Sequence, residues 1–200
     1  MGRFIMKIYT TFFILIVSVC KAQSPILPLD YNPLNLVEGA YYKDLNDELT
    51  KFTGTWKYTN GTTSFTIVFQ KKAMFFNSED NYYEDILIGE YKYIENGVEK
   101  VNTLPNLTIN YANQYKYNIA GLILYPDTII TNPKKIELNF NDPEREYLNR
   151  AIRVKYIPAQ GTVPAKIEVK WTGNMSVLPN ENSPTEIRVP EQDYILEKQP

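Results

Sequence analysis

The sequence contains no histidine, and its one cysteine is Cys20. Without histidine, neither a Ser-His-Asp triad nor a Cys-His pair can form, and zinc cannot be bound through histidine. If Cys20 is removed with an N-terminal signal peptide, thiol chemistry and disulfide bonds are excluded as well. We therefore expect a protein that is not an enzyme and that holds no metal and no cofactor.

The N-terminal residues have the layout of a secretory signal peptide. Lys7 precedes an apolar run at residues 8–19, about a dozen residues where a spanning helix needs ~20. Cleavage after Ala22 would leave Gln23 as the N-terminus, whereas cleavage before Cys20 would give a lipoprotein anchored through that cysteine. We predict a signal peptide at residues 1–22 and a periplasmic or secreted protein with no transmembrane segment in its mature form. The lipoprotein is the alternative.

Neither sign of charge dominates. The chain has 21 basic and 23 acidic residues and a net charge of -2, and the predicted signal carries only basic residues. The mature chain is therefore mildly acidic, and a chain without a basic patch binds nucleic acid poorly. We expect no nucleic-acid partner, and the sequence leaves the oligomeric state open.

Two short features precede the main body of the chain. Residues 23–42 hold three prolines and no consistent period, which predicts an extended lead-in. Leu45, Leu49 and Phe52 follow helical spacing behind Asp44, which can cap a first turn. We expect one short helix that ends at Gly54, within a single domain at residues 43–200.

The remainder alternates between apolar and polar residues with period two, which indicates antiparallel strands with one buried face. The residues predicted to face inward are Phe65, Ile67 and Phe69; Leu87, Tyr91 and Tyr93; Leu107, Ile109 and Tyr111; Ile136, Leu138 and Phe140; Ile152, Val154 and Tyr156; Ile167, Val169 and Trp171; Ile187 and Val189; Tyr194 and Leu196. Asn60-Gly61 and Asn96-Gly97 lie between such runs and favour tight hairpins. We predict an all-β, up-and-down meander of about 8 to 10 strands, closed into a barrel so that no edge is exposed.

The stretch Gly54-Thr55-Trp56, after a short helix and at the head of the first barrel strand, resembles the Gly-x-Trp signature of lipocalins and related calycin barrels. The resemblance implies a lipocalin-like barrel in which Trp56 plugs the closed end and Gly54 lets the preceding segment pass close beneath it. It also implies a basic residue from a late strand across the tryptophan, with Arg150 or Arg153 as candidates. Over its whole length the chain is similar to uncharacterised small secreted proteins of flavobacteria, which bring no known activity.

An acidic cluster and a wealth of aromatic residues are the remaining candidates for function. Glu79, Asp80, Glu84 and Asp85 could hold calcium or supply a glycosidase pair, but their spacing does not match a calcium loop, and we interpret them as a solvated turn. The 16 tyrosines either fill a β core or line a ligand site. The candidate ligand-lining residues are Tyr58, Phe65, Phe69, Tyr91, Tyr93, Tyr111, Tyr115 and Tyr117. Because Phe75 and Phe76 are adjacent, at least one of their rings must lie off the main core.

The leading functional hypothesis is a non-catalytic secreted barrel that binds a small apolar or aromatic ligand. The alternative is a protein-interaction or structural module of the cell envelope, which a filled barrel would favour. A third possibility is a hydrolase with paired carboxylates. It requires two inward acidic residues in a cleft, whereas nearly every acidic residue of the alternating runs is predicted to face outward.

Overall fold

The structure is a computed structural model, and it describes residues 24–29, 35–124, 135–176, 178 and 180–200. The predicted signal peptide, including Cys20, lies outside the described residues. In the described ranges no helix is long and apolar enough to cross a membrane.

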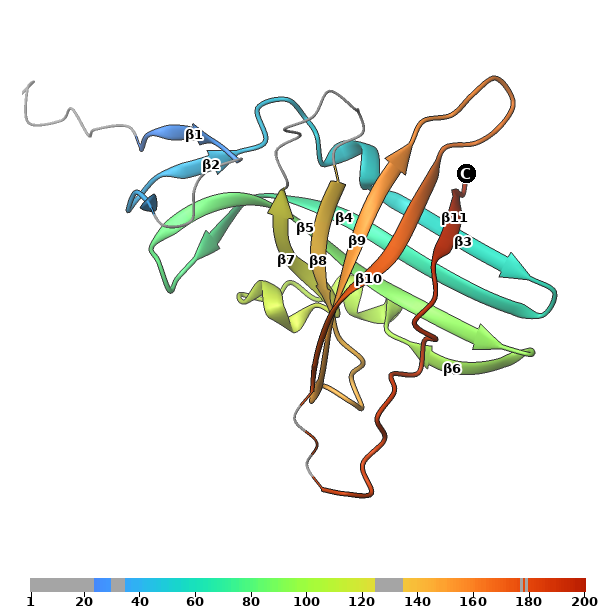
Figure 1. Cartoon of the computed structure of the whole chain (residues 1–200). Coiled ribbons are helices and arrows are strands. Elements are labelled where there is room, and N and C mark those ends of the chain that lie inside the picture. Colours follow the sequence, from blue (N-terminus) through green and yellow to red (C-terminus); the bar gives the residue numbers. More distant parts are fainter. Residues whose placement is uncertain (1–23, 30–34, 125–134, 177, 179) are drawn as a thin grey trace, which may run out of the picture.

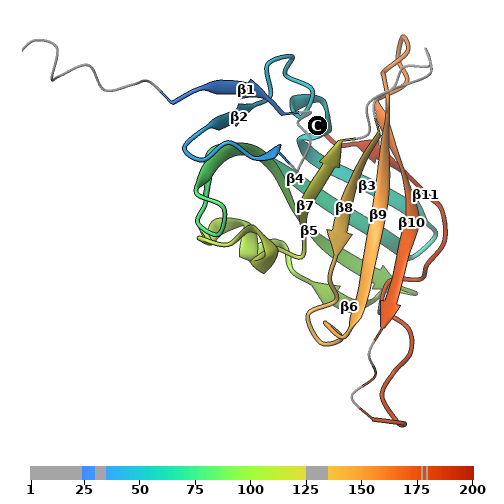
Figure 2. The same cartoon turned by 60° about the vertical axis from the view of Figure 1, so that its left-hand side comes forward.

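Eight antiparallel strands close into a barrel (Figures 1 and 2). They are β3 (Gly54–Asn60), β4 (Thr63–Asn77), β5 (Tyr82–Glu95), β7 (Ile119–Leu124), β8 (Lys135–Phe140), β9 (Leu148–Ile157), β10 (Lys166–Ser176) and β11 (Tyr194–Lys198). Each pairs with the next in this order, and β11 returns to β3. The join between β5 and β7 rests on one registered pair, Gly89 with Ile119. The prediction of an all-β, up-and-down barrel is confirmed.

The predicted alternation places the core correctly on most strands. The predicted inward residues of β4, β5 and β8, and Tyr194 and Leu196 of β11, are all buried in one continuous cluster. Tyr156 and Trp171, at the ends of their runs on β9 and β10, are partly buried and pack against it. The described inward side chains of these strands therefore form one continuous apolar core.

The predicted strand through Leu107, Ile109 and Tyr111 is wrong. The chain forms a short 3-10 helix, η3 (Leu104–Thr108), then an irregular stretch and a second 3-10 helix, η4 (Gln114–Lys116). This connection between β6 (Val98–Asn102) and β7, residues 103–118, is called the outer segment below. Its apolar residues cover the outer face of β5, so that Ile86, Ile88 and Glu90 are buried on the side that alternation assigns to solvent.

Ile187 and Val189 are buried as predicted, but without a strand. Arg188 between them donates through its backbone N–H to Asp142, at 2.8 Å, and its Nη2 lies 2.5 Å from the same carboxylate. Asp142 is fully buried, and although burial alone would raise its pKa, the hydrogen bonds from Arg188 hold that pKa below the ordinary value. The ion pair holds the segment before β11 against the barrel.

The predicted helix over Asp44 to Phe52 forms turns and one short 3-10 helix, η2 (Thr50–Phe52). Asp44 does cap this stretch, because its carboxylate accepts hydrogen bonds from the backbone N–H groups of Glu48 (2.8 Å) and Leu49 (2.9 Å). Asp47 has a positive φ of 53°, a left-handed conformation that an α-helix does not contain. This residue separates the two turns.

Two tight turns connect strands at the predicted positions. Asn96 and Gly97 both have positive φ, 51° and 80°, as a two-residue hairpin turn between β5 and β6 requires. At the other position, Gly61 and Thr62 form the loop, and Asn60 is the last paired residue of β3.

β4 and β5 are longer than their barrel neighbours and extend beyond the barrel as a hairpin (Figure 2). Pairing with β3 stops at Phe69 of β4, whereas pairing with β5 continues to Asn77. The free part, residues 71–86, is called the projecting hairpin. Within the predicted lead-in, β1 (Ile26–Pro28) and β2 (Tyr41–Lys43) add to it in parallel, in the order β1-β2-β5-β4.

Candidate functional site

The interior of the barrel is packed with aromatic rings. Phe65 of β4 lies 4.9 Å from the ring centre of Tyr194 and 6.1 to 6.4 Å from those of Tyr91, Tyr93 and Phe140. Tyr91 in turn lies 4.4 Å from Phe140. All five rings are buried. These side chains occupy the space in which an up-and-down barrel of this size could hold a small ligand.

The predicted ligand-lining residues therefore divide into two groups. Phe65, Phe69, Tyr91 and Tyr93 are core residues, and Tyr58 packs its half-buried ring 5.2 Å from Tyr194. Tyr111, Tyr115 and Tyr117 belong to the outer segment, outside the barrel. The sequence predicted the second group at the end of a strand and near a polar loop, and these three tyrosines line the described pockets outside the barrel.

Trp56 is fully buried near the start of β3. Its indole Nε1 donates to the backbone carbonyl of Phe52 at 2.6 Å. The ring of Tyr156 packs edge to face against the rings of both Phe52 and Trp56. The basic residue over the indole is Lys198 of β11, whose Nζ is 4.5 Å from the ring centre. The expectation that Arg150 or Arg153 takes this place is wrong, because Arg150 pairs with Glu191 and Arg153 with Glu137.

Gly54 has a role beside Lys198. Its φ is +98°, and a Cβ built on it would lie 2.6 Å from Lys198 Nζ. Lys198 also donates to the backbone carbonyl of Thr53, and burial lowers the pKa of its ammonium group. The residue that passes close to the glycine is thus Lys198 and not the preceding segment.

The outer segment is held on β5 by two buried carboxylates. Glu90 is fully buried and accepts hydrogen bonds from the backbone N–H (3.2 Å) and the side-chain amide (2.7 Å) of Asn118. Glu84 accepts from Gln114 Nε2 at 3.1 Å. Burial raises the pKa of Glu90 above its ordinary value and that of Glu84 to about 7, against the opposing effect of these hydrogen bonds.

The acidic cluster predicted as a solvated turn is only half solvated. Glu79 and Asp80 are exposed at the hairpin tip, whereas Glu84 and Asp85 are 8% and 2% exposed. The two buried residues are adjacent on β5 and so point to opposite faces, which does not give the facing carboxylates of a glycosidase. No group of three or more potential metal-ligating side chains occurs among the described residues.

Asp85 organises the projecting hairpin. Its carboxylate accepts hydrogen bonds from the Tyr41 hydroxyl (2.5 Å), the Asp44 backbone N–H (3.1 Å) and the Met74 backbone N–H (3.1 Å). Burial, and then the bond to Asp85, raise the pKa of Tyr41 to about 12. Met74 has a positive φ of 51° and lies in a bulge of β4 between Lys72 and Phe75. One carboxylate thus ties β2, the bulge and the turn at Asp44 together.

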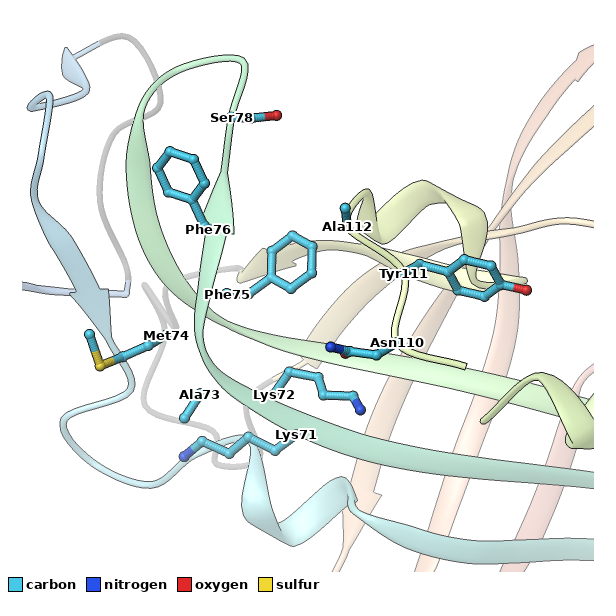
Figure 3. A pocket seen from close by; sticks show the side chains of 10 residues that line it. All are labelled: Lys71, Lys72, Ala73, Met74, Phe75, Phe76, Ser78, Asn110, Tyr111 and Ala112. Atoms are coloured by element: carbon cyan, nitrogen blue, oxygen red, sulfur yellow. The ribbon is translucent and has the colours of Figure 1, made fainter. Parts of the chain in front are cut away.

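A pocket of about 470 Å³ lies between this bulged part of β4 and the outer segment (Figure 3). It is lined by Lys71, Lys72, Ala73, Met74, Phe75, Phe76, Ser78, Asn110, Tyr111 and Ala112. Its volume is in the range of small-molecule sites. Phe75 points toward the outer segment and packs with the apolar cluster beneath it, whereas Phe76 stacks on Tyr83, 5.0 Å between ring centres, and is 42% exposed. At least one ring was predicted to lie off the main core, and neither Phe75 nor Phe76 belongs to the buried cluster of the barrel.

Two further hollows adjoin the outer segment. A small one of about 30 Å³ shares Phe75, Phe76, Ser78 and Ala112 with the main pocket and reaches Gln114 and Tyr115. A polar groove of about 350 Å³ lies beyond Tyr115. It is lined by Tyr115, Lys116, Tyr117, Asn118, Asn139, Asn141, Glu146 and Asn149. Both are lined by tyrosines that were predicted to contact a ligand. Neither combines a large volume with apolar walls, as the pocket of about 470 Å³, called the main pocket, does.

Sequence reasoning missed Lys72, Asn110 and Ala112 as site residues. The adjacent phenylalanines indicated a ring outside the core, and the Lys71-Lys72 pair before them interrupts the alternation of β4. These two irregularities were the available signals. The contact with residues 110–112 depends on the outer segment folding back over β5, which no local pattern indicates.

No curated protein and no solved structure is measurably similar to this chain. One family model does match, over residues 4–199 and hence nearly the whole chain. Its members are described as a family of unknown function. The chain therefore belongs to the family DUF6705.

Proposed function

We propose that the protein is an exported bacterial binding protein, without catalytic activity, that holds a small apolar or aromatic molecule outside its barrel. The observation that carries the proposal is the contrast between a barrel core of buried aromatic rings and an outer pocket of about 470 Å³ with Phe75 in its wall. Ligand sites are typically concave and mostly apolar, with a few polar groups that orient the ligand.

Several sequence features support the wider parts of this proposal. The signal-peptide layout at residues 1–22 supports export, with the lipoprotein anchored at Cys20 as the alternative. The Gly54, Trp56 and Lys198 arrangement supports a lipocalin-like barrel. The absence of histidine and the separation of the buried carboxylates support a role that is not catalytic.

A substitution that fills the pocket tests the site. Ala112 is exposed and borders both the main pocket and the small hollow, so Ala112→Trp should block the space without disturbing the core. The matched control is Ala159→Trp, in the exposed loop between β9 and β10. We expect the neutral dye phenylnaphthylamine to gain fluorescence with the wild type and Ala159→Trp but not with Ala112→Trp. Equal signals from all three proteins would place the dye elsewhere and contradict the proposal.

A row of exposed and half-buried hydrophobic side chains favours the interaction module as a second candidate. Ile26, Tyr41, Tyr83 and Phe76 are register partners across β1, β2, β5 and β4, and therefore share one face of the sheet. Ile26 is 52% exposed, and the two tyrosines are half-buried. If a protein docks on this face, Phe76→Ser should abolish a complex detected by native mass spectrometry, and Ala112→Trp should leave it intact.

A further inference from the structure

The main pocket has an excess of positive charge. Its ten lining residues include two lysines and no acidic side chain. Lys71 is already neutralised, since its Nζ lies 2.9 Å from Asp44 and 3.0 Å from Asp47. Lys72 is half-buried and forms no ion pair with any carboxylate in the described part of the chain. Among the described residues, the Lys72 ammonium group of this pocket thus has no carboxylate partner.

The β4 bulge brings this ammonium group to the same side as the aromatic wall. In a regular strand, residues three apart such as Lys72 and Phe75 would face opposite ways. The register shift between them changes this, because Lys72 pairs with Ile86 and Phe75 with Glu84, both on the outer face of β5. Figure 3 shows Lys72 and Phe75 directed toward residues 110–112, whereas Lys71 and Met74 point to the other side.

The adjoining hollow contributes an unused acceptor. Gln114 is 7% exposed and donates through Nε2 to Glu84, but its Oε1 is buried and accepts no hydrogen bond within the described ranges. An acceptor buried without a donor is destabilising, so a native structure needs a reason for it. A polar N–H or O–H group of a bound molecule that reaches this hollow would provide the donor.

The bulge also argues against an extended peptide as the occupant. Added strands bind through a regular row of backbone groups along a sheet edge. Here the Met74 N–H is bonded to the Asp85 side chain and its φ is positive, which interrupts that row in the middle of the pocket. Bulges of this kind protect edges from pairing.

We propose that the pocket binds a small amphipathic molecule with a flat apolar body and one anionic group. The body lies against Phe75, and the anion is held by Lys72, with the Asn110 side-chain amide beside it. This inference rests on the proposed function and narrows its ligand class. It identifies Lys72 as the specificity-determining residue.

A pair of dyes with the same aromatic body tests the proposal. Anilinonaphthalene sulfonate carries an anionic group, and phenylnaphthylamine does not. Titration calorimetry should show that the wild type binds the sulfonate more tightly, and that added salt weakens this binding. Lys72→Gln should weaken sulfonate binding about tenfold, in line with the loss of one charge-assisted hydrogen bond, and change phenylnaphthylamine binding less than twofold. Lys72→Arg should retain the preference.

The control is Lys57→Gln, at an exposed position on β3, which should bind both dyes like the wild type. The anionic ligand class is wrong if Lys72→Gln binds the sulfonate as tightly as the wild type does, or if the wild type prefers the neutral dye. Either result leaves the proposed small-molecule pocket itself unaffected. If neither dye binds the wild type, both the ligand class and the proposed function are overturned.

Discussion

Lys198 and Trp56 are register partners on β11 and β3, and the lysine Nζ lies 4.5 Å from the centre of the indole ring. The last strand of the barrel thus covers the residue at the head of the first one. A cation over an aromatic face contributes about 0.5–2 kcal/mol, depending on its solvation. Together with the indole bond to Phe52, this contact secures the closing pair of strands, which has only two register pairs.

Truncation of Trp56 should unfold much of this end. Trp56→Ala is expected to lower the free energy of unfolding by ~3–5 kcal/mol, because the indole is fully buried and leaves a large cavity. Denaturant melts measure the loss. Trp171→Ala is the matched control and should cost less, since Trp171 is only partly buried. A loss below ~1 kcal/mol for Trp56→Ala would contradict a plugging role.

Gly54→Ala separates two effects that coincide at one residue. The positive φ alone should cost roughly 1 kcal/mol, and the contact of the new Cβ with Lys198 should add to it. Gly161→Ala is the control, because Gly161 has a φ of +58° and nothing within 4 Å of a built Cβ. Thermal melts should show a greater loss at Gly54 and partial recovery in Gly54→Ala/Lys198→Ala. Equal losses at both glycines would rule out the close approach.

Glu84 should make stability depend on pH. Its pKa is raised from 4.5 to about 7 in the folded state, so the folded protein retains a proton that the unfolded chain has released. The free energy of unfolding must therefore fall as the pH rises from about 4.5 to about 7. Glu84→Gln should remove this dependence and stabilise the protein at pH above that window by roughly 3 kcal/mol, with almost no effect well below it.

Urea melts across this pH range measure the effect, with Glu79→Gln at the exposed hairpin tip as the control. The control should follow the wild-type profile. A Glu84→Gln profile parallel to that of the wild type would show that Glu84 titrates normally in the folded protein.

Asp85→Ala should loosen the projecting hairpin and with it the pocket. The substitution leaves the Tyr41 hydroxyl and the N–H groups of Asp44 and Met74 without their acceptor, at a cost of about 1–3 kcal/mol per unsatisfied buried donor. Hydrogen exchange should accelerate at residues 71–77, and phenylnaphthylamine binding should weaken. Asp80→Ala, exposed in the same hairpin, should change neither. Unchanged exchange in Asp85→Ala would show that the bulge holds without this carboxylate.

The parts of this structure that could be predicted are the strands in which apolar and polar residues alternate along the sequence. Phe65, Ile67 and Phe69 indicated both a strand and its buried face, and Gly54 with Trp56 marked where the barrel begins. The same rule failed at Leu107, Ile109 and Tyr111, because apolar residues on an irregular segment can cover the outside of a sheet at the same spacing.

The remaining features depend on contacts between residues that are far apart in the sequence. Lys198 could not be chosen over Arg150 and Arg153 because it meets residues almost the whole domain away in sequence. Glu84 and Asp85 looked solvated since their partners, Gln114 and Tyr41, lie far along the chain. The pocket depends on a bulge at Met74, where a non-glycine residue adopts a positive φ that its sequence does not indicate.

The proposed function requires that a small molecule occupies the pocket between β4 and the outer segment. The most direct measurement is native mass spectrometry of the mature protein, purified from its own periplasm or medium, followed by denaturation and identification of what is released. We predict a discrete small-molecule adduct in the wild type and in Ala159→Trp, anionic and partly aromatic after release, and its loss in Ala112→Trp. A bare wild-type mass, or an adduct that Ala112→Trp retains, would contradict the account.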